Sequence, residues 1–584
     1  MKTLVHRLAK FSGQAPAVWL ALVVFLLTAL PSKAADIKLE AEDATLTGVT
    51  VARANAGYSG TGYVQGFDNS FAKNVRFTVN VPTTGIYDLT IRYGTPSSEK
   101  GYVLEVNGQR SEGMFPFVAG YGTAQSGKYQ LTAGTNTITI GGGWGFYTLD
   151  YINLSPATIP LPAKPLKTLT DPNTTASTKN LFSYMVDLYG TKVLAAQQET
   201  NALQEIDYVR THSGKDPAIG SFDLIEYSPS RIQHGANPAG FSEKAIQWAN
   251  RDQGRGIISL MWHWNAPTDL INQAPDKLWW SGFYTRATTF NFAAALADKN
   301  GAKYQLMLRD IDAIAVELKK FQAQDIPVLW RPLHEAAGGW FWWGAQGAAP
   351  FKELWQILYD RLTNHHNLHN LIWVYTAERG KPEWYPGDAY VDIVGIDIYE
   401  NTAVASNLSG QWTELQAMFN GKKLVTLSET GNLPNPDYIR TFGTWWSWFA
   451  VWNGADFIRK QPSSLIHSVF NDPDVITLDE LPDWRNYRSV TGIDLENTFT
   501  HLSVYPNPAN SGQLTIRITV TSPVKATFTL FNATGAKVAE VSKQFTSGAN
   551  QVQIPLKNFP NGIYVLSIQK GAEQICRKVV VQKQ

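Results

Sequence analysis

Two glutamates close short, strand-like apolar runs in the central part of the chain. Glu335 ends the run Trp330-Arg-Pro-Leu-His-Glu335, and Glu429 ends the run Leu424-Val-Thr-Leu-Ser-Glu429. Cleavage of a glycosidic bond with retention of configuration needs one carboxylic acid to protonate the leaving oxygen. It also needs an ionised carboxylate, about 5 to 5.5 Å away, to attack the anomeric carbon. We therefore expect Glu335 and Glu429 to form a catalytic pair.

An aromatic, glycine-rich cluster follows Glu335 directly, with the sequence Gly338-Gly-Trp-Phe-Trp-Trp-Gly344. Flat ring faces commonly hold sugars, while a few polar groups fix the orientation of the ligand. The same tryptophans could instead be core residues, and this alternative stays open for each ring taken singly. We expect Trp340 here, and Trp452 in a second aromatic run at 445–452, to be the rings on which a sugar stacks.

The two glutamates need a scaffold that brings distant segments together, and residues 178–490 have the pattern of one. Short apolar runs alternate there with amphipathic helical stretches such as Ile311–Phe321 and Phe351–Leu362. Eight such repeats over about 300 residues predict a (β/α)8 TIM barrel, an α/β fold whose chemistry lies at the carboxyl ends of the strands. The glutamates then end the fourth and seventh strands. The expected strands are Val193–Ala196, Asp223–Glu226, Gly256–Met261, Pro327–Trp330, Leu371–Tyr375, Ile393–Asp397, Leu424–Leu427 and Trp446–Trp452.

Several side chains around the pair have roles that follow from charge and position. Glu429 must stay ionised, and the phenol of Tyr399 at the end of the sixth strand can donate a hydrogen bond to it. Glu335 must hold its proton, which apolar neighbours and the anionic partner favour by raising its pKa. Arg331 lies about 13 Å from Glu335 along the strand, at roughly 3.3 Å per residue. We count it among the substrate-binding residues but expect it to brace carboxylates deeper in the barrel. His263, between two tryptophans, is a candidate for substrate binding or, alternatively, a core histidine.

The barrel resembles glycoside hydrolase family 26, whose best-known members are endo-β-1,4-mannanases. The resemblance is carried by Trp330–Gly344, Met261-Trp-His-Trp264, Gly395-Ile-Asp-Ile-Tyr399 and Leu427-Ser-Glu-Thr-Gly431. It implies β-mannan as the substrate and a retaining mechanism without a cofactor, with Glu335 as acid/base and Glu429 as nucleophile. A β-1,3-xylanase or mixed-linkage β-glucanase on the same barrel, or a polysaccharide-binding protein without activity, are the alternatives.

The resemblance also assigns a role to His334, which stands where related barrel families commonly have asparagine. It implies that His334 contacts the sugar beside the cleaved bond. Strict strand alternation would turn His334 away from Glu335, so this role requires a bulge or a twist at the strand end.

Residues 36–156 have a different sequence pattern, in which apolar and polar residues alternate in runs separated by Gly, Pro and Asn turns. This pattern predicts a β-sandwich. The segment resembles the carbohydrate-binding modules of families 35 and 6. The resemblance is carried by Leu39-Glu-Ala-Glu-Asp43, Gly57-Tyr-Ser-Gly-Thr-Gly62 and Gly143-Trp-Gly-Phe-Tyr-Thr-Leu-Asp-Tyr-Ile152.

Two sites are expected in this module. Glu40 and Glu42 share one face of a strand and could, with Asp150, bind a structural Ca²⁺; solvated edge carboxylates are the alternative. The candidates for stacking on sugar are Trp144, Tyr58 and Tyr121, of which the tyrosines could equally be core residues. A proline-rich linker over residues 157–177 should leave the module tethered to the barrel but partly independent of it.

The two ends of the chain carry export signals. Lys2, Arg7 and Lys10 precede an apolar run at 17–30 and a small-residue pattern at 32–35, which predicts a secretory signal peptide over residues 1–35. A membrane anchor is the alternative, but the run is short for a spanning helix, so we expect no membrane span in the mature protein.

Residues 500–584 predict a small β-sandwich. It resembles the type A C-terminal sorting domains of the Bacteroidetes type IX secretion system, through Tyr505-Pro-Asn-Pro508, Asn532-Ala-Thr-Gly535 and Asn561-Gly-Ile-Tyr564; a third accessory sandwich is the alternative.

Composition excludes several classes of function. With 50 basic and 49 acidic residues and no basic block, the chain has no electrostatic footprint for nucleic acid. Its single cysteine, Cys576, permits neither an internal disulfide nor a cysteine-based metal site. We expect a secreted, extracellular or surface-attached bacterial monomer. Its partners would be β-mannan or a related plant polysaccharide and the type IX secretion machinery.

Overall fold

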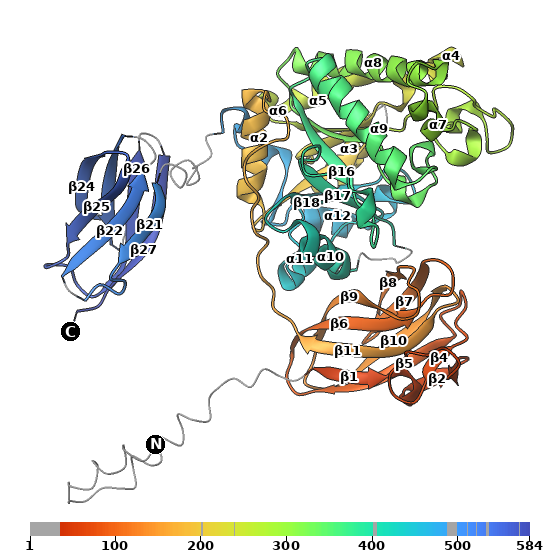
Figure 1. Cartoon of the computed structure of the whole chain (residues 1–584), viewed down its shortest axis with the longest axis horizontal. Coiled ribbons are helices and arrows are strands. Elements are labelled where there is room, and N and C mark those ends of the chain that lie inside the picture. Colours follow the sequence, from red (N-terminus) through yellow and green to blue (C-terminus); the bar gives the residue numbers. More distant parts are fainter. Residues whose placement is uncertain are drawn as a thin grey trace, which may run out of the picture.

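The computed structural model describes residues 36–199, 203–238, 240–400, 406–487, 499–510, 512–520, 523–532, 536–570 and 573–583. The expected signal peptide, residues 1–35, lies outside the described residues. Three units follow one another along the chain: a β-sandwich, a (β/α)8 barrel and a second β-sandwich (Figure 1). No helix within the described ranges combines the length and the apolar character that crossing a bilayer requires.

The N-terminal unit, or module, consists of two antiparallel sheets. Its strands alternate buried and exposed residues, as in β5, where Val75, Phe77 and Val79 point into the core, because successive side chains of a strand point to opposite faces. One sheet has the order β3-β4-β11-β6-β9 with β1 on β11, and the other has the order β2-β5-β10-β7-β8. The strands are β1 (Ile37–Glu40), β2 (Thr45–Thr47), β3 (Thr50–Ala52), β4 (Tyr63–Gln65), β5 (Asn74–Val81), β6 (Gly85–Gly94), β7 (Lys100–Val106), β8 (Gln109–Phe115), β9 (Gly122–Leu131), β10 (Gly134–Trp144) and β11 (Thr148–Pro156).

Parallel strands close into the barrel and confirm the expected fold. The ladder runs β13-β14-β15-β16-β17-β18-β19-β12, and β12 also pairs with β13, so the barrel has no open edge. Nearly every strand residue is buried, as expected where helices cover the outside and side chains fill the inside. The strands are β12 (Val193–Gln198), β13 (Ile219–Asp223), β14 (Ile257–Trp262), β15 (Val328–Pro332), β16 (Leu371–Thr376), β17 (Ile393–Ile398), β18 (Leu424–Thr430), β19 (Trp448–Val451) and the additional β20 (Val475–Ile476) on β12.

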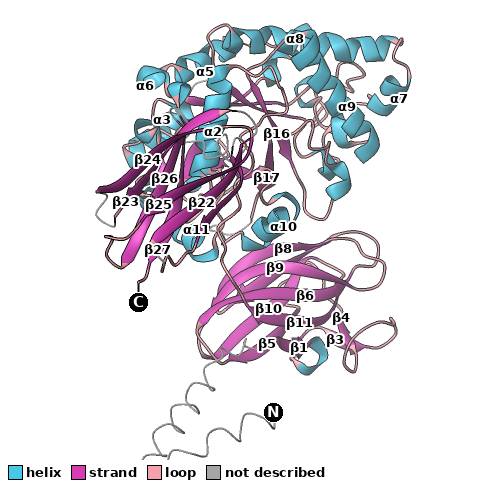
Figure 2. Ribbon diagram, turned by 60° about the vertical axis from the view of Figure 1, so that its left-hand side comes forward, coloured by secondary structure: helices cyan, strands magenta, loops and turns pink. Residues whose placement is uncertain are grey.

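Helices cover the outside of the barrel (Figure 2). In α8, the buried residues Met307, Ile311, Ile314, Leu318 and Phe321 recur every three or four positions, so one face of the helix joins the barrel core. The helices are α2 (Ala176–Leu188), α3 (Gln204–Ser213), α4 (Pro229–Gln233), α5 (Phe241–Ala249), α6 (Arg251–Gly254), α7 (Phe292–Ala297), α8 (Ala302–Gln322), α9 (Ala348–Asp360), α10 (Ser409–Phe419), α11 (Pro436–Phe442) and α12 (Ser463–Phe470).

The C-terminal unit has its own core between two antiparallel sheets. Their orders are β21-β22-β25 and β24-β23-β26-β27, and Ile516, Phe528 and Leu566 are fully buried between them. The strands are β21 (Phe499–Tyr505), β22 (Gln513–Val520), β23 (Val524–Phe531), β24 (Lys537–Phe545), β25 (Gly548–Pro555), β26 (Gly562–Lys570) and β27 (Glu573–Val581).

Two barrel strands differ from the expected ranges. The second strand is Ile219–Asp223 rather than Asp223–Glu226. Asp223 ends it, because its carboxylate accepts hydrogen bonds from the main-chain amides of Ile225 and His263, and a 3-10 turn follows over Ile225–Tyr227. The eighth strand covers Trp448–Val451 and is shorter than predicted.

The linker and the module both pack against the barrel. The amide of Ala163 donates to Asn420 Oδ1 at 2.7 Å, and helix α2 already begins at Ala176, inside the expected linker. In the module, the amide of Lys128 donates to Ser409 Oγ at 2.6 Å. The expectation of a partly independent module is therefore wrong for this structure, because hydrogen bonds to the barrel hold both segments in place.

Candidate active site

Glu335 and Glu429 meet at the carboxyl end of the barrel. Glu335 follows β15, which ends at Pro332, and Glu429 lies near the end of β18. One carboxylate oxygen from each of Glu335, Asp397 and Glu429 lies within 4.8 Å of the other two. This separation is close to the roughly 5 to 5.5 Å of retaining glycosidases and well below the roughly 6.5 to 9.5 Å of inverting ones.

A strained turn places Glu335 after β15. Leu333 and Glu335 have φ angles of 51° and 52°, in the left-handed region that the Cβ atom disfavours. Leu333 is buried in the core, while Glu335 faces a cavity above the barrel. The turn is the twist at the strand end that the sequence analysis required.

A bulge sets Glu429 beside Asp397. On β17 and β18, Ile396 pairs with Leu427 but Asp397 pairs with Glu429, so Ser428 is the extra residue. Ser428 Oγ donates to Asp397 Oδ1 at 2.6 Å. The sequence analysis gave Asp397 no role. A carboxylate two residues before Tyr399, on the same face of one strand, was the available signal.

Arg331 contacts these carboxylates from deeper in the barrel. Its Nη1 donates to Asp397 Oδ2 at 2.8 Å and to Thr376 Oγ1 at 3.1 Å, and its Nη2 donates to Glu429. These contacts confirm the expected bracing of carboxylates. Arg331 is only 1% exposed. Because a fully buried guanidinium cannot touch a substrate in this conformation, Arg331 is removed from the predicted substrate-binding residues.

The two glutamates differ in their hydrogen-bond donors. Glu429 accepts from Arg331 and, at 2.5 Å, from Tyr399 Oη, as expected, whereas Glu335 accepts from Trp340 Nε1 at 2.9 Å. Burial, followed by the negative charge of Asp397, raises the pKa of both glutamates. The arginine and the phenol donate to Glu429 and favour its ionised form, which favours Glu335 as the carboxyl that holds the proton of the pair.

Only one ring of each aromatic run reaches solvent. Trp340 is 45% exposed and lines the cavity above Glu335, whereas Trp342 and Trp343 are fully buried. In the run 445–452, Trp452 is partly exposed, its ring centroid 6.2 Å from that of His263, and the other tryptophans are buried. The core alternative therefore applies to the buried rings, while Trp340 and Trp452 stay the predicted sugar platforms.

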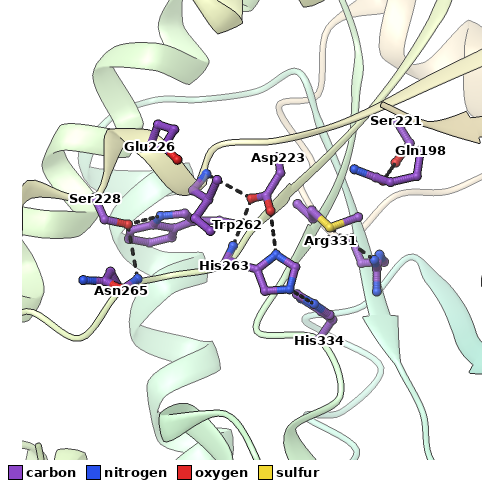
Figure 3. A network of polar contacts seen from close by, with 12 residues as sticks. Gln198, Ser221, Asp223, Glu226, Ser228, Trp262, His263, Asn265, Arg331 and His334 are labelled. Atoms are coloured by element: carbon purple, nitrogen blue, oxygen red, sulfur yellow. Dashed lines mark hydrogen bonds and ion pairs between the residues drawn. The ribbon is translucent and has the colours of Figure 1, made fainter. Parts of the chain in front are cut away.

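A chain of polar contacts runs from Asp223 through His263 to His334 (Figure 3). His263 Nδ1 lies 2.5 Å from Asp223 Oδ2, and His263 Nε2 lies 3.2 Å from His334 Nε2. Burial by itself would raise the pKa of Asp223, but the charge of His263 holds that pKa below its ordinary value. Burial, followed by the charge of His263, lowers the pKa of His334 well below its usual range.

Both histidines are buried rather than open to the cavity. His334 is 1% exposed and packs between His263 and Phe341, with ring centroids at 4.5 and 5.1 Å. The sugar contact expected of His334 stays a prediction, although its ring is buried in this conformation. His263 is buried as well, which matches the core-histidine alternative.

The three aromatic candidates of the module do not form one site. Tyr58 and Tyr121 both lie against the buried Tyr63, with ring centroids at 5.8 and 6.0 Å from it. Trp144 ends β10 in the other sheet and is 53% exposed. Both tyrosines are partly exposed and neither belongs to the module core, so their two readings stay open, whereas Trp144 has a solvent-exposed ring.

The expected Ca²⁺ ligands are only partly suited to a metal. Glu40 Oε2 and Glu42 Oε2 are buried and have no hydrogen-bond partner among the described residues, which fits ligands of a cation. Asp150 does not fit, because its Oδ2 accepts from Arg92 Nε at 2.7 Å and its Oδ1 from the amide of Ser59 at 2.9 Å. Asp150 is therefore removed from the predicted ligand set.

Three segments of the chain match known protein families. Residues 170–480 match glycosyl hydrolase family 26, residues 37–157 match the carbohydrate binding module of family 35, and residues 503–582 match a secretion system C-terminal sorting domain. The three matches cover the barrel, the N-terminal sandwich and the C-terminal sandwich in turn.

Two curated relatives and one solved structure are described as mannan-degrading enzymes. The chain is 43% identical, over 76% of its own length and 91% of the relative's, to a mannan endo-1,4-beta-mannosidase of Thermothelomyces thermophilus. It is 35% identical to mannan endo-1,4-beta-mannosidase A of a Piromyces species, over 80% of this chain and 76% of that protein. The crystal structure of a Podospora anserina GH26-CBM35 β-(1,4)-mannanase shares 44% identity, covers 77% of this chain and 99% of its own, and superposes with a TM-score of 0.55.

Proposed function

The chain belongs to glycosyl hydrolase family 26, and from this premise we propose that it is a retaining endo-β-1,4-mannanase. The observation that supports the proposal most is the close pair of Glu335 and Glu429. Glu429 accepts hydrogen bonds from Arg331 and Tyr399, and Glu335 accepts one from Trp340, which favours an ionised Glu429 and a protonated Glu335. The named relatives from Thermothelomyces and Piromyces are mannan endo-1,4-beta-mannosidases, which supports mannan as the substrate. The β-1,3-xylanase and mixed-linkage glucanase alternatives receive no support from them.

In the first step, a carboxylate oxygen of Glu429 attacks the anomeric carbon while Glu335 gives its proton to the glycosidic oxygen. The bond between the anomeric carbon and that oxygen breaks, an ester bond to Glu429 forms, and the leaving part of the polysaccharide departs as an alcohol. Tyr399 and Arg331 keep Glu429 ionised and oriented before the attack, because both donate to its carboxylate.

In the second step, the roles of Glu335 reverse. Burial and then the charge of Asp397 raise the pKa of Glu335 in the free enzyme. Once Glu429 is esterified, one negative charge of this carboxylate cluster is gone, so Glu335 gives up a proton more easily and can act as a base. It takes a proton from a water molecule whose oxygen attacks the anomeric carbon and releases Glu429. Two inversions at one carbon retain its configuration, and neither step needs a cofactor.

A reducing-sugar assay on a panel of polysaccharides tests the substrate assignment. We expect the highest kcat/KM on β-mannan, with lichenan and β-1,3-xylan as competing substrates and the Glu429→Ala variant as the inactive control. A higher kcat/KM on lichenan or xylan than on mannan would overturn the assignment.

The sorting domain indicates a secreted or cell-surface protein. We also propose a structural Ca²⁺ in the module, held by the Glu40 and Glu42 carboxylates. The buried Oε2 atoms of both glutamates support this site, although Lys38 Nζ already contacts Glu40 Oε1 at 2.7 Å. The cation would tie β1 to the turn that follows it.

A further inference from the structure

The module is docked on the barrel beside the mouth that holds Glu335. The amide of Lys128 on β9 donates to Ser409 Oγ at 2.6 Å, and Asn407 Nδ2 donates to Lys128 O at 2.8 Å. Arg379 Nη2, on the loop after β16, donates to Gln125 O at 3.1 Å. Figures 1 and 2 both show β8 and β9 facing α10. These contacts fix the orientation of the module, because they involve the main chain of a strand.

The cavity above Glu335 has one wall from each domain. Glu335, Trp340 and Tyr399 line it on the barrel side, and Met114 and Trp144 line it on the module side. Its volume of about 450 Å³ lies within the roughly 300 to 1,000 Å³ of ligand pockets. A chain bound at the catalytic pair would therefore continue into a space that the module bounds.

Trp144 is the exposed aromatic side chain on the module wall, since Tyr102, which also lines the cavity, is buried. Trp144 ends β10 opposite Gly101 of β7, so the residue paired directly with it has no side chain. It is 53% exposed and is not part of the module core, and Lys100 Nζ lies 5.7 Å from the ring centroid. Large exposed aromatic surface on a cavity wall is typical of a binding site, since a ligand that covers it removes apolar area from water.

A buried carboxylate on the barrel side offers a hydrogen-bond acceptor to the same ligand. Glu378 Oε2 accepts from Lys381 Nζ at 3.2 Å, whereas Glu378 Oε1 is buried without a partner in the described part of the chain. A buried acceptor without a donor is costly, and a sugar hydroxyl is a suitable donor. Lys381 Nζ also lies 3.4 Å from Glu99 of the module, so this polar cluster joins the two walls.

We propose that this shared cavity is a set of sugar subsites beyond the catalytic pair, in which Trp144 of the module stacks on the same polysaccharide chain that Glu335 and Glu429 cleave. The module is then part of the substrate cleft as well as a binding domain. The ligand class is a neutral polysaccharide, since the walls offer a flat ring and carboxylate acceptors, and the nearby Arg379 and Lys381 already pair with glutamates. The identity of the sugar rests on the proposed function.

Steady-state kinetics on manno-oligosaccharides of increasing length test this inference in the full chain. If Trp144 adds subsites beyond the catalytic pair, a long substrate gains more from it than a short one, so the readout is the ratio of kcat/KM for mannohexaose to that for mannotriose. We expect Trp144→Ala to lower this ratio about tenfold, which corresponds to roughly 1.4 kcal/mol and to the scale of an aromatic stacking contact. Trp144→Tyr, which keeps a flat ring, should restore most of the ratio.

Phe146→Ala is the matched control, because Phe146 lies two residues after Trp144, is 65% exposed and does not line the cavity. Its ratio should equal that of the unmodified protein. An unchanged ratio in Trp144→Ala, with or without weaker adsorption to insoluble mannan, would overturn the inference, as would an equal loss in Phe146→Ala. Cleavage of mannotriose and mannohexaose by the unmodified protein tests the mannanase assignment separately. If neither is cleaved, that assignment fails and this inference fails with it.

Discussion

Replacing Tyr399 with phenylalanine removes one hydrogen bond to Glu429 and leaves the aromatic ring in place. The phenol donates to Glu429 Oε2 at 2.5 Å. The buried surroundings of the phenol, followed by the charge of Glu429, raise the pKa of Tyr399 above its ordinary value, so the phenol keeps its proton near neutral pH and can donate. A hydrogen bond to a charged group contributes about 1.5 to 3 kcal/mol, which corresponds to about a 10- to 150-fold change. We expect kcat/KM on mannohexaose to fall by a factor in this range.

The same substitution should move the pH profile. A hydrogen bond to a carboxylate favours its ionised form, so loss of the bond raises the pKa of Glu429, by about one to two units at 1.36 kcal/mol per unit. Activity is lost as the pH falls and the nucleophile becomes protonated, so the acidic limb of the kcat/KM profile should shift to higher pH by that amount.

Tyr375→Phe is the control for this experiment, because Tyr375 is a buried tyrosine on the neighbouring β16 and does not line the cavity. Its kcat/KM and its acidic limb should match those of the unmodified protein. A Tyr399→Phe variant with unchanged kcat/KM and an unmoved acidic limb would refute the argument that the phenol keeps Glu429 ionised.

Three further predictions concern the acid, the buried arginine and the module. Glu335→Ala should lose most activity on polysaccharide but far less on aryl mannosides, whose leaving groups depart without a proton; equal losses would remove Glu335 from this role. Arg331→Met should lower the free energy of unfolding by about 3 to 5 kcal/mol, because Asp397 and Glu429 lose their counter-charge. This deficit should shrink as the pH falls through the raised pKa of Glu429, and melting curves that show a pH-independent deficit would contradict it. Ca²⁺ at about 100 times its dissociation constant should raise the free energy of unfolding of the module by about 2.7 kcal/mol, and an equal response in Glu42→Gln would exclude this ligand.

Most of the fold could be predicted from the sequence because its signals are local. Apolar runs such as Leu371–Tyr375 and helical faces such as Ile311–Phe321 lie within single elements, and the structure contains both. The second barrel strand could not be predicted correctly, because Asp223 looks like the start of an apolar run. Its carboxylate instead accepts from main-chain amides and ends the strand.

The catalytic pair could be predicted from residue types alone. Contacts of the site that depend on strand register could not be predicted. Paired carboxylates at strand ends pointed to Glu335 and Glu429 without any knowledge of geometry. The position of Asp397 beside Glu429 depends on a bulge at Ser428, and no local pattern signals an extra residue in a buried strand. The docking of the module likewise depends on contacts such as Lys128 with Ser409, which are 281 residues apart in the chain.

Release of the first product from a β-1,4-manno-oligosaccharide tests the central claim most directly. In the proposed mechanism, the short separation of Glu335 and Glu429 leaves no room for water between the nucleophile and the anomeric carbon, so Glu429 attacks directly and the configuration is inverted twice. Proton NMR recorded in the first minutes of hydrolysis should therefore show the β-anomer, which mutarotates only later. An α-anomer as the initial product would contradict the retaining mechanism and the roles proposed here for both glutamates.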